Sequence, residues 1–322
     1  MDFFEQLLRK RFSSVRFGFA YGSGVFEQAG YNLNARKSPK DLPMIDLIVV
    51  VDNVKQWHKE NLHRYPFDYW QPLAMLGADA ITKVQTNFGA GLYYNTLVPL
   101  DCERKIKYGV ISTEHFLEDL TDWRWLYTSG RLHKPVRIIQ NKDANKDDSP
   151  LQTALKQNLR SALAASLLLL PTKFTEDLLY QTITGLSYSG DFRMTIGENP
   201  KKVQNIVLTN IEHFRNLYGP LLHDFIKTGM MSLNTSNLHG IERNYNKDTN
   251  ASTQKALIQE LPCRIHQKLN MIGESDIQNA LRNILIQTTK SSSKGQAIKG
   301  FVTAGPKKSI QYGLAKLQKM FH

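Results

Sequence analysis

The sequence has few cysteines and no hydrophobic run long enough to cross a membrane. Cys102 and Cys263 are the only cysteines in 322 residues, which excludes a disulfide framework and is typical of a reducing compartment. The longest apolar stretch, Ala162 to Leu170, reaches about half of the roughly 20 residues that a spanning helix needs. With 41% hydrophobic residues, the chain is expected to be a soluble or peripheral globular protein.

Acidic residues are absent from residue 277 to the end of the chain. The whole sequence has 41 basic and 29 acidic residues and a net charge of +12. Eight of the basic residues lie in the terminal stretch: Arg282, Lys290, Lys294, Lys299, Lys307, Lys308, Lys316 and Lys319. Such a surplus predicts a polyanionic partner, which can be nucleic acid, anionic lipid or both.

Two common phosphate-binding motifs are also missing. A P-loop needs Gly-Lys-Ser or Gly-Lys-Thr, and neither occurs. A dinucleotide fingerprint fails because Glu27 stands where its third glycine should be. What is present is Gly22-Ser23-Gly24, directly after an apolar run that ends at Tyr21. This pattern fits the Gly-Ser turn of nucleotidyltransferases, where backbone N–H groups and a serine hydroxyl hold a triphosphate, although an ordinary glycine turn would look the same.

A lone carboxylate, Asp46, interrupts the apolar run from Pro43 to Val51. Burying it unpaired would cost several kcal/mol, so it either reaches water at the strand end or meets a cation such as Mg²⁺ bound to phosphate oxygens. The usual Asp-x-Asp pair is absent because Ile48 occupies the second position. The second metal ligand therefore stays unassigned, with four candidates: Asp191, and more weakly Asp68, Asp101 and Glu103.

Other polar residues complete the predicted site. Lys107 interrupts an apolar strand and could neutralise phosphate charge, or face water on an edge strand. We expect Asp46 and Lys107 to be catalytic, and a nucleotide to contact Tyr21, Gly22, Ser23, Gly24 and Tyr108. A glycine-bounded loop of the second domain supplies further candidates: Tyr188, Asp191 and Arg193. A turn with its own internal ion pair would have the same sequence.

The pattern of elements predicts an α/β fold. We expect strands over 15–21, 43–51, 89–100 and 104–112 in a mixed sheet, and helices over 151–170, 172–184 and 203–225. The polar segment 141–150 is the best boundary between domains, and segment 234–252 is rich in turn formers. The expected organisation is a nucleotidyltransferase domain (1–145), an α-rich winged-helix domain (146–230), and a flexible segment with a basic C-terminal region (231–322).

Several segments, in this order, resemble the mitochondrial translocator-assembly-and-maintenance proteins, which are the mitochondrial-type CDP-diacylglycerol synthases. The segments are FAYGSGVFEQAGY, MIDLIVVVDN, GAGLYYN, KYGVIS and GLSYSGDFRM. The resemblance implies a nucleotidyltransferase domain followed by a winged-helix domain. It also implies transfer of CMP from CTP to phosphatidic acid, with Mg²⁺, at the matrix face of the inner mitochondrial membrane, where the product feeds cardiolipin synthesis. By resemblance, the Gly-Ser turn is Gly22 and Ser23, and the metal carboxylate is Asp46.

The last residues predict a basic amphipathic helix that binds an anionic membrane surface as a peripheral anchor. Its apolar stripe and flanking lysines give the expected membrane-binding residues: Lys307, Lys308, Leu314, Lys316, Leu317, Lys319 and Phe321. Packing of this helix back onto the winged-helix domain is the alternative. For the whole chain, two further functions stay open: a nucleic-acid-binding winged-helix protein, and a nucleotidyltransferase acting on RNA or protein. The favoured interpretation expects no nucleic-acid partner.

Overall fold

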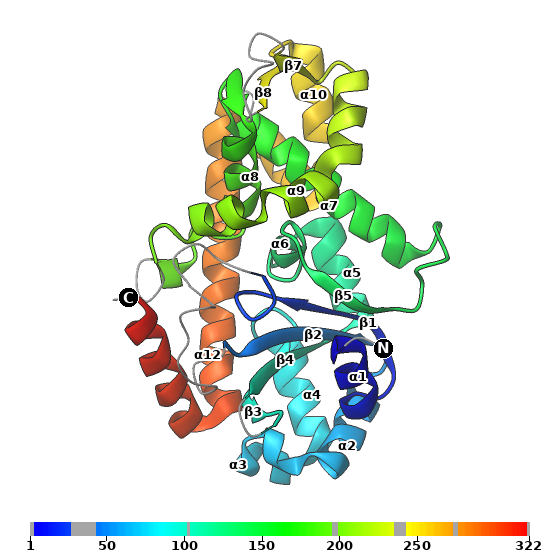
Figure 1. Ribbon diagram of the computed structural model, residues 1–322, viewed down its shortest axis with the longest axis vertical. Helices are drawn as coiled ribbons and strands as arrows, with labels where there is room; N and C mark the ends of the chain where they lie inside the picture. Colours follow the sequence, from blue (N-terminus) through cyan, green and yellow to red (C-terminus); the bar gives the residue numbers. More distant parts are fainter. Residues whose placement is uncertain are drawn as a thin grey trace.

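The computed structural model describes residues 3–26, 43–101, 104–194, 199–234, 243–272 and 276–320, with side chains described up to residue 305. It divides into a larger and a smaller sheet, each with its own helices, and one long helix runs along both (Figure 1). Glu27, Cys102, Glu103 and Phe321 lie outside the described residues, and the other predicted membrane-binding side chains lie beyond residue 305.

The larger sheet is mixed and has the strand order β3-β4-β2-β1-β5. Only β2 and β4 run parallel, and the other neighbours are antiparallel. The strands are β1 (Val15–Tyr21), β2 (Ile45–Val51), β3 (Tyr93–Pro99), β4 (Lys105–Ser112) and β5 (Arg137–Asn141). The first four agree with the predicted ranges, because apolar runs of this length are typical of strands buried on both faces. Strand β5 was not predicted, since its sequence RIIQN is short and only partly buried.

Helices cover both faces of this sheet. One face, which we call the α2 face, carries Leu47, Val49 and Tyr108 and packs on α1 (Phe3–Arg11) and α2 (Val54–Arg64). The opposite α5 face carries Phe19, Ile48 and Ile111. It packs on α5 (Thr113–Asp122), α6 (Ser129–Leu132) and the start of α7 (Pro150–Leu169). Because strand residues alternate between faces, each position in a strand has a known face.

Three short helices follow α2 and complete this half of the molecule. They are η3 (Pro66–Asp68), α3 (Gln71–Met75) and α4 (Gly77–Asn87). Their apolar residues Leu73 and Ile81 pack with Tyr69 and with Tyr93 of β3 in a small core of their own. The start of α2 is fixed by Asn53, whose side chain accepts a hydrogen bond from Gln56 N at 2.9 Å.

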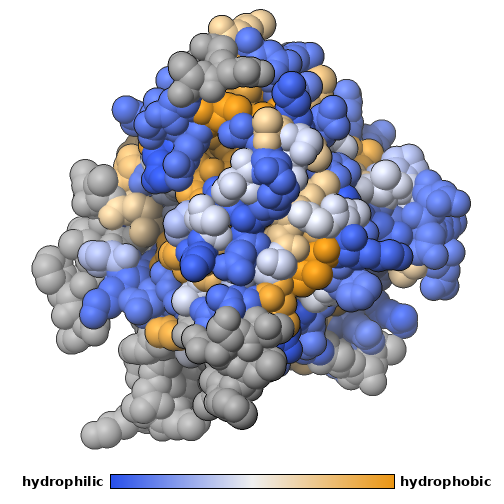
Figure 2. All heavy atoms as spheres, turned by 90° about the horizontal axis from the view of Figure 1, so that it is seen from above, coloured by the Kyte–Doolittle hydropathy of each residue, from blue (hydrophilic) through white to orange (hydrophobic). Residues whose placement is uncertain are grey.

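The smaller sheet has the order β6-β8-β7 and is antiparallel. Its elements follow α7 in the order β6 (Lys173–Thr175), α8 (Glu176–Gly185), η4 (Phe192–Met194), α9 (Lys202–Lys227), β7 (Met231–Asn234) and β8 (Asn244–Lys247). The helices agree with the predicted ranges to within a few residues, except that the predicted start of the second helix is strand β6. Phe174 of β6 stacks on Tyr245 of β8, with ring centroids 5.9 Å apart. Seen from this end, the surface is largely hydrophilic (Figure 2).

The segment that was predicted as the boundary between domains packs against the larger sheet. Segment 141–150 packs on β1, since its buried Asp143 accepts a hydrogen bond from Arg16 Nε at 3.0 Å. Helix α7 serves both cores: Leu151 lies in the core of the larger sheet, and Leu163 in that of the smaller one. The division therefore falls within α7, because a polar sequence can be held by a buried ion pair as well as form a linker.

The chain after residue 230 contains packed elements as well, in contrast to the expected flexible segment. Helices α10 (Ala251–Gln259), α11 (Cys263–Ile272) and α12 (Ile277–Met320) follow β8. Tyr245, Leu257 and Leu281 belong to the same core as α7 to α9. Strand β8 could not be predicted from this region, because the region is rich in turn formers and the strand has one apolar residue, the buried Tyr245.

Helix α12 connects the two halves of the molecule. It packs on α7 and α11 at one end and reaches β3 farther along (Figure 1). Its backbone leaves helical geometry at Gly305 and is helical again up to Met320. Among the described residues, no helix combines the length and the apolarity that crossing a bilayer requires.

Candidate active site

The ends of three neighbouring strands bring Tyr21, Asp46 and Lys107 side by side. Tyr21 pairs with Asp46 in the antiparallel β1–β2 ladder, and Asp46 pairs with Lys107 in the parallel β2–β4 ladder. Paired residues point to the same face, which here is the α5 face. The register therefore places a phenol, a carboxylate and an ammonium group together, and all three belong to the predicted site residues.

The predicted glycine turn lies directly against this group. Gly22 has a φ of 80°, a left-handed conformation that favours glycine, and a side chain there would start 3.4 Å from Asp46 Oδ2. A Cβ on Gly24 would lie only 2.6 Å from Met44 O, so the turn needs glycine there too. Within the described residues, no acceptor binds the backbone N–H of Ser23 or Gly24, which leaves two donors for an anion.

The Asp46 carboxylate is incompletely satisfied. Its Oδ1 lies 3.4 Å from Lys107 Nζ as an ion pair. The same oxygen is buried and has no hydrogen-bond donor in the part of the chain that the structure describes. An unsatisfied buried carboxylate oxygen is costly, so Asp46 is a candidate ligand for a cation. Groups of three or more acidic, histidine or cysteine side chains that could hold a metal are absent from the described residues.

Two tyrosines and Lys107 form the wall behind this carboxylate. The hydroxyl oxygens of Tyr21 and Tyr94 are 3.4 Å apart, and Lys107 Nζ lies 4.5 Å from the centroid of the Tyr94 ring. Burial raises the pKa of both phenols above the usual range, so both are neutral near pH 7.

The segment 123–131, between α5 and the end of α6, adds a cation. The Arg131 guanidinium carbon lies 3.9 Å from the centroid of the Tyr127 ring and 5.2 Å from that of Tyr21. Arg131 Nη1 donates to Tyr127 O at 2.5 Å, whereas its buried Nε has no hydrogen-bond partner among the described residues. After Asp46 Oδ1, this nitrogen is a second unsatisfied polar atom, on a residue that stacks over the Tyr21 ring beside Asp46.

The electrostatics of Tyr127 show how positive this region is. Burial raises the pKa of its phenol, but three neighbouring cations outweigh that effect and lower the pKa to about 8. In order of effect, these cations are Arg131, Arg193 and Lys107. They come from α6, η4 and β4, so both halves of the molecule contribute positive charge around one buried ring.

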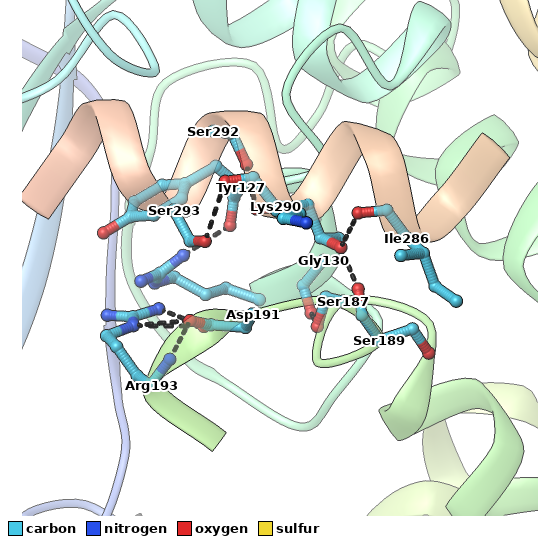
Figure 3. Close-up of polar contacts among 12 residues, drawn as sticks. Tyr127, Gly130, Ser187, Ser189, Asp191, Arg193, Ile286, Lys290, Ser292 and Ser293 are labelled. Atoms are coloured by element: carbon cyan, nitrogen blue, oxygen red, sulfur yellow. Dashed lines mark hydrogen bonds and ion pairs between the residues drawn. The ribbon is translucent and has the colours of Figure 1, made fainter. Parts of the chain in front are cut away.

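The predicted loop of the smaller domain meets the site (Figure 3). Asp191 is buried, and both of its oxygens accept hydrogen bonds from Arg193, the shortest at 2.5 Å from Nη2. Helix α12 crosses the same loop, where Thr289 Oγ1 donates to Ser189 O. A further contact between the two halves joins Phe26, which follows the glycine turn, to His213 of α9, with ring centroids 5.4 Å apart.

A second group of cations extends from Arg131 toward the start of α9. Lys134 Nζ donates to Gly130 O and to Ser187 Oγ, the latter at 2.9 Å. The Nζ atoms of Lys134 and Lys202 lie 4.9 Å and 5.4 Å from the centroid of the predicted Tyr188 ring. Burial, and then the nearby Arg131 and Lys202, hold the pKa of Lys134 well below its usual range.

Tyr108 does not belong to this site, contrary to the prediction. It neighbours Lys107 in β4, so strand alternation turns its side chain to the α2 face. There it is fully buried, and its hydroxyl donates to Asp68 Oδ2 at 2.6 Å. Asp68, a weak candidate for the second metal ligand, therefore lies on the wrong face and is also paired with Arg11.

The other candidates for a second ligand are equally occupied. Asp101 accepts hydrogen bonds from Arg104 in the turn between β3 and β4, at 2.7 Å and 2.9 Å. Asp191 reaches the site, but Arg193 engages both of its oxygens. The described residues thus offer Asp46 as the carboxylate that is available to a cation.

Sequence analysis missed Tyr94, Tyr127, Arg131 and Lys134. Tyr94 could have been found, because it lies on the α5 side of a strand that was predicted correctly. The other three come from an irregular segment or a very short helix, where no periodicity indicates which side chains share a face. Segment 123–131 contains aromatic and basic residues, but only the folded chain brings them to the sheet.

Comparison with known proteins identifies the family. A family model described as "Phosphatidate cytidylyltransferase, mitochondrial" matches residues 4–319. The chain belongs to this family. Curated proteins of the same name are similar over nearly their full length. The Xenopus laevis protein is 41% identical, covering 95% of this chain and 90% of its own. The Drosophila melanogaster protein is 42% identical, covering 96% and 95%. The Bos taurus protein is 39% identical, covering 99% and 94%.

A solved structure of a nucleotidyltransferase-like protein from Exiguobacterium sibiricum also matches this member of the mitochondrial phosphatidate cytidylyltransferase family. The match covers 92% of this chain and 77% of the other, with 10% identity and a TM-score of 0.23. A likeness this slight carries no weight for the fold. The family assignment rests on the sequence matches.

Proposed function

We propose that this chain is a phosphatidate cytidylyltransferase, which transfers the cytidylyl group of CTP to phosphatidic acid and releases pyrophosphate. The observation that carries the proposal is the strand register that sets Asp46 and Lys107 beside the turn at Gly22. Membership of the family, over residues 4–319, supports the same reaction. The product, CDP-diacylglycerol, would feed cardiolipin synthesis.

The described groups fit a triphosphate. The backbone N–H groups of Ser23 and Gly24, which have no acceptor among the described residues, suit phosphate oxygens. Lys107 and Arg131 supply positive charge within the same group of side chains. Arg131 Nε and Asp46 Oδ1 lack hydrogen-bond partners among the described residues. A phosphate oxygen could accept from Arg131 Nε, and a cation bound to the phosphates could meet Asp46 Oδ1.

Mg²⁺ fits the donor set as an ion shared with the nucleotide. Mg²⁺ is commonly bound through one or two carboxylates together with substrate phosphates, and Asp46 offers one buried oxygen without a hydrogen-bond donor in the described part of the chain. Asp46 would hold the ion, which would neutralise phosphate charge when bound. Lys107, already 3.4 Å from the same oxygen, would stay beside the phosphates.

The reaction itself needs little from the protein beyond positioning and charge. A nonbridging oxygen of the phosphatidate monoester forms a new bond to the α-phosphorus of CTP, and the bond from that phosphorus to the α–β bridging oxygen breaks. A phosphate monoester is already a dianion near neutral pH, so a strong general base is unnecessary. Backbone donors, Lys107 and Arg131 would stabilise the charge on the transferring group and on pyrophosphate.

The smaller domain is proposed to be a winged helix. Its order of helix, strand, two helices and two strands (α7, β6, α8, α9, β7, β8) supports this assignment, as does the sheet order β6-β8-β7. Its loop brings Asp191 and Arg193 to the site, which is a reason to assign it to catalysis and not to nucleic-acid binding.

We also propose that the protein is peripheral to the matrix side of the inner mitochondrial membrane and binds it through residues 307–322. The basic, acid-free sequence of this segment supports the proposal. Deleting residues 307–322 should reduce co-sedimentation with cardiolipin vesicles while CTP binding survives. Equal sedimentation of the full-length and shortened proteins would oppose it. A control in which only Lys307, Lys308, Lys316 and Lys319 become Gln separates charge from apolar contact.

One assay tests the main proposal. Pyrophosphate release is measured with each of the four nucleoside triphosphates, with and without vesicles that contain phosphatidic acid. We expect release only with CTP and phosphatidic acid together, and CDP-diacylglycerol as the second product. Release that needs RNA or a protein acceptor, or that ignores phosphatidic acid, would replace the proposal by one of the other transfer reactions.

A further inference from the structure

The segment that carries Tyr127 and Arg131 into the site is held by one buried carboxylate. Asp119 lies in α5, is 1% exposed and accepts six hydrogen bonds from residues 125–129. Its Oδ1 accepts from Trp125 N at 2.9 Å. Its Oδ2 accepts from the backbone N–H of Tyr127 at 3.1 Å, and from both the N–H and the hydroxyl of Thr128 and Ser129, at 2.6 to 3.2 Å.

The backbone around this carboxylate takes unusual conformations. Trp123 and Leu126 have φ values of 50° and 49°, which cost energy for residues other than glycine. Such a conformation persists when surrounding contacts fix it. Here the carboxylate of Asp119 draws the backbone N–H groups of the segment toward one point, so it compensates for the strain with charge-assisted hydrogen bonds.

We propose that Asp119 is a positioning residue, whose carboxylate holds the segment 123–131 so that Tyr127 and Arg131 reach the active site. Asp119 contacts neither Asp46 nor Lys107, and it acts through the segment alone. The proposal rests on the proposed function only in assigning the site to nucleotidyl transfer. The position of Tyr127 and Arg131 relative to each other can be tested without any reaction.

The substitution Asp119→Asn would keep the size of the side chain but reverse part of its hydrogen bonding. The amide can keep its oxygen toward the five donors that meet Oδ2, but its NH₂ then faces the N–H of Trp125. That contact must break, and the other five lose the negative charge that strengthens them. In Asp119→Asn we therefore expect kcat/KM for CTP to fall about 10- to 100-fold, as for misplaced binding groups. The matched control is Glu118→Gln. Glu118 is the neighbouring carboxylate of α5 and pairs with Arg124 at the surface, so activity should stay within about twofold.

The pKa of the Tyr127 phenol distinguishes positioning from a general effect on stability. It should change only if Asp119 positions the segment, and it should stay the same if Asp119 merely stabilises the fold. Its phenol is faced by Arg131 of α6, Arg193 of η4, Lys107 of β4 and the Tyr94 ring of β3. If Arg131 moves away, its lowering effect is lost and the pKa of Tyr127 must rise above about 8. Tyrosine ionisation is followed by NMR of ring-labelled tyrosine, and the signal of Tyr127 is assigned with Tyr127→Phe.

The outcomes separate cleanly. A folded Asp119→Asn protein with reduced kcat/KM and a raised Tyr127 midpoint supports the proposal. A folded variant in which Tyr127 titrates as in the parent overturns it, whether or not activity falls. If Asp119→Asn does not fold, Thr128→Val removes only the hydroxyl donor at 2.6 Å, and a smaller shift in the same direction is expected. If the parent turns over another substrate, the proposed function fails while the Tyr127 titration still tests Asp119.

Discussion

Two carboxylates on opposite faces of one sheet, Asp68 and Asp46, differ in how their oxygens are satisfied. On the α2 face, Asp68 accepts hydrogen bonds from Arg11 on both oxygens and from the Tyr108 hydroxyl. On the α5 face, Asp46 Oδ1 has a lysine at 3.4 Å and no hydrogen-bond donor in the described part of the chain. A completed network indicates a structural role, and an incomplete one indicates a binding role.

The contrast teaches that burial and charge alone do not identify a site. Both side chains are acidic and largely buried, and both touch residues of β4. They differ in the face of the sheet on which they lie. Lys107 and Tyr108 are consecutive in β4, so their side chains point to opposite faces, one toward Asp46 and the other toward Asp68. On the α2 face, Arg11 of α1 completes the network of Asp68. On the α5 face, positive charge comes also from the smaller domain, through Arg193.

The largest effect should come from Asp46→Asn. The substitution keeps the size of the side chain but removes the charge that would hold Mg²⁺, so turnover should fall by about a thousandfold or more while the fold is retained. The measurement is pyrophosphate release at ordinary Mg²⁺, with thermal unfolding in parallel. Asp52→Asn, at an exposed residue directly after the same strand, is the control and should be active. Near-parental activity of Asp46→Asn would remove Asp46 from the site.

Asp68→Asn should show the reverse pattern. Breaking one side of a buried ion pair leaves Arg11 without its partner, so the free energy of unfolding should fall by about 3–5 kcal/mol. Activity per folded molecule should change little, because Asp68 faces away from the site. Denaturant unfolding gives the first quantity and the assay at low temperature gives the second. A stable but inactive Asp68→Asn protein would contradict the division between the two faces.

Much of the fold and part of the site were predictable from the sequence. The strands β1 and β2 are largely apolar runs, each with one charged residue, so their ends, and with them Gly22 and Asp46, could be located. The neighbourhood of Asp46 and Lys107 depends on a parallel β2–β4 pairing. The opposite charges of Asp46 and Lys107 are compatible with neighbouring strands, but the sequence alone does not establish that β2 and β4 pair. The assignment of Tyr108 was avoidable, because two consecutive strand residues cannot share the face of Asp46.

The rest depended on tertiary contacts. Segment 123–131 has no periodicity, and its path is set by hydrogen bonds to Asp119 and by positive φ at Trp123 and Leu126. Arg131 and Tyr127 reach the site only because of that path. The division between the two cores depends on tertiary contacts for a similar reason, since one helix, α7, packs in both and no change of composition marks the division.

The glycine turn provides a smaller test of the α5 face. Gly22→Val would place a branched side chain at a φ of 80° and against Asp46 Oδ2, so we expect affinity for CTP to fall about 100-fold. Ser23→Ala removes one hydroxyl and leaves the backbone donors, so a loss of about 2- to 10-fold is expected. Nucleotide titration measures both. Equal, small effects would indicate an ordinary turn between two strands.

A comparatively small effect is expected from Lys107→Met, which tests whether the lysine or the carboxylate dominates the α5 face. Lys107 neutralises Asp46 in the free protein and would neutralise phosphate charge in the complex, so its removal costs only the difference between the two. We expect about a tenfold loss in kcat/KM for CTP. Lys105→Met, two residues away on the same face but exposed, is the matched control and should be near parental.

Because Lys107 acts through the same ligand as Asp46, the double variant with Asp46→Asn should be no worse than Asp46→Asn alone. Additive losses would mean that the two residues act independently, and unchanged kinetics of the single variant would leave Lys107 as a partner of Asp46 only.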